Sequence, residues 1–223
     1  MSQTRFAASA EAPHPPEPRP AAVTIVTTEH FTLQGARSST VEESVGRATM
    51  FLASVSGGLV ALGLVATAAR IGTAFYCFGL VLLPTLALVG LVTFERTLQS
   101  GIEDYGYALR IARLRDYYFD YAPEVSPYLT RVTPNDQLTA EGSRRGGWRW
   151  FRTVASMIAV IAAVLGGSTA GLAVAAGSSS LAATLAAGIV AALVLLAMLM
   201  RYQGSAWRQA VLAALLEEGE DDE

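Results

Sequence analysis

Four long hydrophobic runs divide this chain, and none of them contains a charged residue or a histidine. They cover about residues 48–67, 74–94, 153–176 and 181–200. Because about 20 residues of α-helix cross a hydrocarbon core of about 30 Å, each run is long enough to span a membrane. Short segments at 68–73 and 177–180 join the runs in pairs. The pattern predicts an all-α integral membrane protein, a four-helix bundle of two hairpins with cytoplasmic amphipathic helices.

The polar stretches between and around these runs set the other boundaries. We predict five parts, each defined by a change in composition. They are a disordered Pro-rich tail (1–27), a pre-helix and first transmembrane hairpin (28–94), an amphipathic segment and loop (95–152), a second transmembrane hairpin (153–200), and an amphipathic helix with an acidic tail (201–223).

The start of the first long helix is predicted from capping signals. The tract Val23–Thr27 has strand propensity but no partner strand, so we expect it to be irregular. Ser39 and Thr40 are each followed three residues later by a glutamate, which is the capping-box pattern ahead of a hydrophobic run. The sequence therefore places the beginning of the helix at this point.

Arginine placement predicts the orientation. The chain has no lysine, and of its 16 basic residues only Arg70 lies between the runs of a hairpin. Cytoplasmic segments of membrane proteins carry an excess of basic residues. Both termini and the central segment are thus expected in the cytoplasm.

The central segment holds the candidate binding residues. Apolar and aromatic residues recur at helical spacing from Ile102 to Phe119, with arginines between them, and the helix should stop before Pro123. The candidate lipid or partner surface consists of Arg110, Arg113, Arg115, Tyr105, Tyr117, Tyr118 and Tyr121. Tyrosine prefers the headgroup level and arginine attracts anionic lipid, so we expect a helix anchored at the membrane surface. A protein-contact surface is an alternative, as is a nucleotide or nucleic-acid pocket, although the segment lacks a Gly-rich phosphate loop.

The C-terminal segment is predicted to form a second, short amphipathic helix over 205–216. Trp207, Val211 and Leu215 share one face of this helix. An acidic run from Glu217 to Glu223 follows and is typical of a solvated tail.

Rows of small residues predict where helices approach each other in the membrane. The longest row has four-residue spacing and consists of Ala163, Gly167, Gly171 and Ala175. Gly57 lies in a similar row between Ala53 and Ala61. Small residues let helix backbones approach closely in lipid, although a chain rich in Ala and Gly also forms such rows by chance. The pattern leaves open whether the row at 163–175 contacts the fourth run or another copy of the protein.

Candidate chemistry is sparse. Cys77 is the single cysteine, and both histidines, His14 and His30, precede the first run. We identify no catalytic residue, metal site or cofactor site, and nucleic acid is not an expected partner. The expected function is a non-enzymatic membrane scaffold or partner-binding protein. The alternative is an oligomeric channel or small-solute permease, and a lipid-headgroup enzyme is a third option.

Four stretches resemble a family of small actinobacterial membrane proteins of unknown function. They are Glu29–Gln34, Val45–Thr49, Phe94–Asp104 and Arg113–Tyr118. The likeness covers about residues 28–130. It implies a bacterial plasma membrane and supplies neither an activity nor functional residues. From the residues themselves, the expected partners are anionic lipid headgroups at the cytoplasmic face, with a membrane protein or a second copy of the chain as further candidates.

Overall fold

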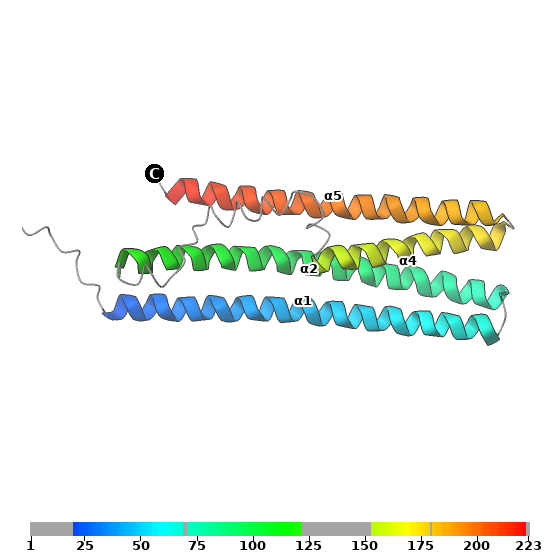
Figure 1. Ribbon diagram of the computed structural model, residues 1–223, viewed down its shortest axis with the longest axis horizontal. Helices are drawn as coiled ribbons and strands as arrows, with labels where there is room; N and C mark the ends of the chain where they lie inside the picture. The colour runs from blue at the N-terminus through cyan, green and yellow to red at the C-terminus, as the bar shows by residue number, and fades with distance from the viewer. Residues whose placement is uncertain (1–19, 69–70, 122–152, 179, 222–223) are drawn as a thin grey trace, which may run out of the picture.

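The computed structural model describes residues 20–68, 71–121, 153–178 and 180–221. These residues form α1 (Pro20–Ala68), α2 (Thr73–Tyr121), α4 (Val154–Gly177) and α5 (Leu181–Asp221) (Figure 1). Each helix is long and apolar enough to cross a membrane. The prediction of an all-α membrane protein with two hairpins is confirmed for this part of the chain.

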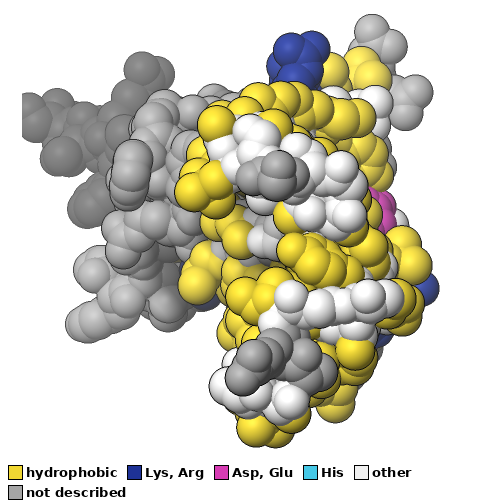
Figure 2. All heavy atoms as spheres, turned by 90° about the vertical axis from the view of Figure 1, so that its right-hand side faces the viewer, with side chains coloured by type: hydrophobic (Ala, Val, Ile, Leu, Met, Phe, Trp, Pro, Cys, Tyr) yellow, Lys and Arg dark blue, Asp and Glu magenta, His cyan; other side chains and the backbone are white. Residues whose placement is uncertain are grey.

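The helices pack mainly against their neighbours in the order α1, α2, α4, α5. Figure 1 shows α1 and α5 at opposite edges of this row, with both hairpin turns at the same end of the molecule. Seen from that end, hydrophobic side chains cover most of the described surface (Figure 2). Hydrophobic side chains on the outside are expected of helices that contact lipid.

α1 begins about twenty residues earlier than the sequence predicted. It starts at Pro20, so the tract Val23–Thr27 is helical rather than irregular, and the residues of the expected capping box lie inside the helix. Both expectations were wrong, because contacts of α1 with α2, such as the Arg37–Asp104 ion pair, outweigh these local signals. Threonine hydroxyls bond back to carbonyls one turn earlier, as Thr28 does to Thr24 at 2.8 Å and Thr40 does to Ala36 at 2.9 Å.

The expected capping glutamate has a different partner. Glu43 accepts a hydrogen bond from Arg47, one turn later, instead of reaching back to the helix start. Proline at the first helical position is favourable because its missing N–H would have no partner there. α1 is then held along its polar half by contacts with α2, described below.

α2 and α5 also continue well beyond their hydrophobic runs. The amphipathic segment that follows residue 94 is the second half of α2, and the helix expected over 205–216 is the last part of α5. α2 ends at Tyr121, as the Ala122-Pro123 pair predicted. The rise of 1.5 Å per residue gives extensions of about 40 Å for α1 and α2 and about 30 Å for α5. We call these three extensions the stalk (20–47, 95–121 and 201–221).

The core lies where α1, α2 and α4 meet. Phe51 of α1 and Ile158 of α4 are each 2% exposed and pack in one cluster with Phe94 and Leu98 of α2. Gly90 of α2 lies so close that an added Cβ would stand 2.9 Å from both Phe51 Cζ and Ala162 Cβ. The absence of a side chain at Gly90 therefore sets the spacing of these three helices.

Several predictions concern residues outside the described ranges. They are the disorder of the first 19 residues, the loop at 132–147, and the expected aromatic-basic belt of Trp148, Arg149, Trp150, Phe151 and Arg152. The side chains of Asp120, Tyr121 and the acidic tail from Glu217 also lie outside the described part.

Candidate functional site

A buried polar cluster connects the start of α4 to α5 at the base of the stalk. Thr153 caps α4 and accepts a hydrogen bond from the Ser156 amide at 3.2 Å. Gln203 of α5 places its Oε1 and Nε2 atoms each 3.3 Å from Ser156 Oγ, and Nε2 lies 3.4 Å from Thr153 Oγ1. Gln203 is 2% exposed and Ser156 is fully buried. The cluster therefore fixes the register of α5 against α4.

A cavity of about 220 Å³ lies beside this cluster. All four helices contribute to its wall at the level where the hydrophobic runs end. The lining includes Thr40, Ser44, Thr97, Ser100, Asp104, Thr153, Gln203 and Trp207. Hydroxyl, amide and carboxylate groups here stand among apolar carbons, so the cavity is suited to a small molecule or to water.

Two polar groups of the cavity wall differ in their hydrogen bonding. The Asp104 carboxylate accepts hydrogen bonds from Arg37 of α1, with Nε–Oδ1 at 2.7 Å and Nη2–Oδ2 at 3.3 Å. This ion pair ties α1 to α2 in the stalk. Thr97, which is 4% exposed, has no hydrogen-bond partner for its hydroxyl within the described part of the chain.

The stalk is held together by aromatic contacts above the cavity. Tyr105 of α2 meets Trp207 of α5 edge to face, with ring centroids 5.8 Å apart. Leu109 of α2 and Val211 of α5 extend this small cluster. Trp207, Val211 and Leu215 were predicted to share a face; in the structure Trp207 and Val211 pack against α2, whereas Leu215 is exposed.

A second aromatic contact lies near the far end of the stalk. His30 of α1 stands edge to face against Tyr118 of α2, with centroids 6.0 Å apart. Partial burial and, to a smaller extent, the nearby positive charge of Arg115 lower the pKa of His30 below its ordinary value. Because the neutral form is favoured in the folded protein, the contribution of His30 to stability is complete above about pH 6.5 and is lost as the pH falls.

The residues of the predicted lipid or partner surface differ in their exposure in the structure. Arg110, Arg113 and Arg115 are exposed, and Tyr117 and Tyr118 are half-buried. Tyr105, by contrast, is 5% exposed and packs inside the stalk. Residues turn by about 100° each along an α-helix, so Arg110 and Arg115 point about 140° apart. The three arginines therefore do not line one face.

These arginines also belong to a helix that continues α2, and not to a separate helix that lies on the membrane surface. α2 runs unbroken from Thr73 to Tyr121 beside α1. With residues 74–94 in the hydrocarbon, Arg110 lies about 24 Å beyond it along the helix axis. Headgroups extend only about 5–8 Å beyond the hydrocarbon on each side. This segment of α2 therefore extends away from the membrane surface instead of lying on it.

The predicted small-residue row lies between α4 and α5. A Cβ added at Gly167 would stand 2.5 Å from the Gly188 carbonyl oxygen, and one added at Gly171 would stand 3.3 Å from that of Thr184. Ala163 is buried and Ala175 is half-buried on the same helix. Gly167 and Gly171 of this row therefore lie against the other helix of their own hairpin. Gly57 of α1 instead faces outward, with nothing within 4 Å of an added Cβ.

No family of known proteins, no curated protein and no solved structure matches this chain. Within the described ranges, no group of three or more His, Cys, Asp or Glu side chains is placed to hold a metal ion.

Sequence analysis missed Gln203 and Ser156, the two most buried polar residues of the site. One signal could have identified Gln203. It lies four residues after Leu199 and seven after Leu196, and both leucines pack against the core. These spacings place Gln203 on the inward face of the helix. Its partners, however, lie 47 and 50 residues away.

Proposed function

We propose that the protein is a non-enzymatic membrane scaffold whose stalk binds a partner protein. The four transmembrane helices anchor the chain, and three of them continue side by side beyond the hydrophobic runs. The Arg37–Asp104 ion pair and the Tyr105–Trp207 contact hold the stalk helices together. Such a stalk offers a preformed surface, so a partner can bind without the cost of ordering the helices.

Exposed leucines near the end of α5 carry this proposal. Leu212 is 59% exposed, Leu215 45% and Leu216 73%. Their spacing of three and four residues places them on one face of the helix. They lie about 18 Å or more beyond the hydrophobic run of α5, outside the hydrocarbon. Grouped apolar side chains in water mark protein-binding surfaces, and a partner helix or groove would bury them.

The side of the membrane follows from charge. Fifteen of the 16 basic residues belong to the two termini and the central segment, and the stalk is built from these segments. The positive-inside rule supports a cytoplasmic stalk. With the resemblance of the sequence to actinobacterial membrane proteins, it also supports a bacterial plasma membrane. The partner is then a cytoplasmic protein or the cytoplasmic part of another membrane protein.

Affinity capture tests the proposal. The full chain, purified from its native membrane in mild detergent, is expected to retain a stoichiometric partner that the Leu212→Gln/Leu216→Gln variant loses. The change removes apolar contact area without adding charge. Ala213→Gln is the matched control, since Ala213 is an exposed neighbour that offers almost no apolar area. Equal capture by all three proteins, or the absence of any stoichiometric partner, would contradict the proposal.

One observation favours a second function, an oligomeric channel. The outer face of α1 presents small residues, and neither Gly57 nor Gly63 has a neighbour within 4 Å of an added Cβ. Further copies could approach α1 closely and enclose a path. Ion or solute flux in proteoliposomes distinguishes this function from the scaffold, which is expected to show none.

A further inference from the structure

Two arginines follow the hydrophobic run of α5 on its outer side. Arg201 comes directly after Met200, and Arg208 lies seven residues later, about 10 Å further along the helix. Seven residues are almost two full turns, so both side chains leave the helix on the same face. Val194, seven residues before Arg201, continues this face into the hydrophobic run and is 54% exposed. The two arginines therefore lie on the side of α5 that would face lipid.

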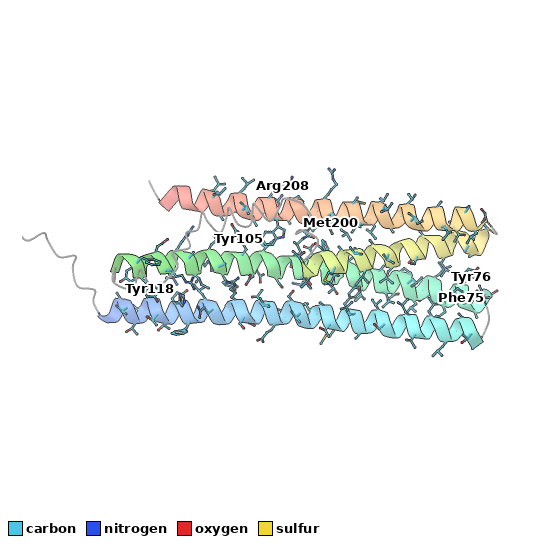
Figure 3. The ribbon with its side chains drawn as sticks, viewed as in Figure 1. Phe75, Tyr76, Tyr105, Tyr118, Met200 and Arg208 are labelled. Atoms are coloured by element: carbon cyan, nitrogen blue, oxygen red, sulfur yellow. The ribbon has the colours of Figure 1, made fainter. Side chains whose placement is uncertain are left out.

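The outer side of α5 is open to lipid. α5 forms one edge of the row of helices (Figure 1). Both arginines are exposed, and Figure 3 labels Met200 and Arg208 on this helix. A lipid headgroup can therefore reach them without displacing any other described helix.

The arginines border an open cleft of about 510 Å³. Its wall consists of Met200, Arg201, Tyr202, Gly204, Ser205 and Arg208. Gly204, which has no side chain, lies between the two arginines along the helix and forms part of this wall. Ser205 Oγ donates a hydrogen bond to the Tyr202 carbonyl oxygen at 2.8 Å, so the hydroxyl proton of Ser205 is already used. The donors that remain for an incoming ligand are the two guanidinium groups.

Neither positive charge is neutralised within the described residues. Arg37 pairs there with Asp104, and Arg47 pairs with Glu43, whereas Arg201 and Arg208 have no acidic partner. Guanidinium groups bind phosphate through paired, charge-assisted hydrogen bonds. Gly204 lies about 6 Å beyond Met200, which is the depth of lipid phosphates next to the hydrocarbon. Arg208 can extend back toward this level through its flexible side chain.

We propose that Arg201 and Arg208 bind one phosphate group above Gly204, and that this phosphate belongs to an anionic phospholipid. The depth of the cleft and its place on the outer face of an edge helix favour a lipid over a free phosphate. The site is distinct from the leucine face proposed for the partner protein, which begins at Leu212. It also gives the expected anionic-lipid partner a position other than Arg110, Arg113 and Arg115.

Titration of the purified full chain with phosphatidylglycerol or phosphatidylcholine, followed by native mass spectrometry, tests the site. We expect the wild type to bind one phosphatidylglycerol more tightly than the others and to show no such preference for phosphatidylcholine. Each charge-assisted hydrogen bond from a guanidinium group to the bound phosphate contributes about tenfold in affinity, so Arg201→Gln/Arg208→Gln should weaken this binding by about a hundredfold. Arg201→Lys/Arg208→Lys keeps the charge and should recover part of the loss.

Arg96→Gln is the matched control. Arg96 is exposed and follows the hydrophobic run of α2 by two residues, at the same depth as Arg201. We expect this variant to bind phosphatidylglycerol like the wild type. An equal loss in Arg96→Gln would show that general surface charge is responsible and would overturn the proposal. Unchanged binding by the double Gln variant, or equal affinity for both lipids, would overturn it as well.

Inorganic phosphate distinguishes the two sources of the anion. Added in millimolar excess, it should leave bound phosphatidylglycerol in place if the lipid chains contribute to binding. Displacement that depends on Arg201 and Arg208 would overturn the assignment to a lipid and show that the cleft takes a free phosphate. Neither result bears on the leucine face, so this site and the proposed scaffold function stand or fall separately.

Discussion

Gly167→Leu is expected to separate α4 from α5 and to cause the largest loss of stability of any single change proposed for this protein. A Cβ at this position would stand 2.5 Å from the Gly188 carbonyl oxygen and 2.6 Å from the Ala192 Cβ. A backbone oxygen cannot rotate aside as a flexible side chain can, so the two helices must move apart. Overpacking of this kind costs about 3 kcal/mol or more. The measurement is thermal unfolding and size-exclusion behaviour in detergent.

A graded series of alanine substitutions provides the controls. Gly167→Ala should be clearly destabilising, because even a single methyl group collides with the Gly188 carbonyl. Gly171→Ala should cost less, since its Cβ would meet the Thr184 carbonyl oxygen at 3.3 Å. Gly57→Ala should be tolerated, because nothing lies within 4 Å. If Gly167→Leu unfolds at the wild-type temperature, the close contact between α4 and α5 does not exist.

Gln203→Leu is expected to have the second largest effect, a loss of about 1–3 kcal/mol. The substitution keeps the approximate size of the side chain but removes its amide. Ser156 Oγ and Thr153 Oγ1 then lose their contacts with α5, and the Ser156 hydroxyl stays buried. The cost arises from the loss of these hydrogen bonds between α4 and α5, while Ser156 Oγ keeps its contact with Thr153 Oγ1 at 2.8 Å. The free energy of unfolding, measured by denaturant titration of the full chain, reports it.

A double-mutant cycle with Ser156→Ala tests this explanation. Removal of both buried partners leaves apolar groups in contact, so Gln203→Leu/Ser156→Ala should be more stable than the sum of the single changes predicts. Purely additive losses would show that the two side chains do not interact. Gln209→Leu is a suitable control, because Gln209 is exposed on the same helix. It should change stability by less than about 0.5 kcal/mol.

The transmembrane part of this fold is predictable because one strong signal decides it. Runs of about 20 apolar residues must be helical in lipid, since only internal hydrogen bonds can satisfy the backbone there. The turns at both hairpins and the end of α2 at Tyr121 follow from short polar linkers and Pro123. The contact of Gly167 with α5 was one of two alternatives that the spacing of small residues allowed.

The polar half of the fold was harder to predict, because local signals there favoured other structures. The strand propensity of Val23–Thr27 and the capping boxes at Ser39 and Thr40 both indicated an interruption of α1. In the structure, contacts between distant segments outweigh them, such as the Arg37–Asp104 pair across 67 residues. The polar cluster around Gln203 depends on similarly distant partners. Only the register between helices, which a sequence pattern does not specify, brings these groups together.

We expect α1, α2 and α5 to leave the membrane together and to continue as a water-exposed stalk on one side. Side-specific labelling of single cysteines tests it most directly. The positions are Ser38, Arg110, Gln209 and Ser178, introduced into a Cys77→Ala background and treated with a membrane-impermeant maleimide in sealed vesicles of both orientations. Ser38, Arg110 and Gln209 should react from the same side and Ser178 only from the other. Labelling of any of the three from the side of Ser178, or protection of the cysteine at 110 from both sides, would contradict the account.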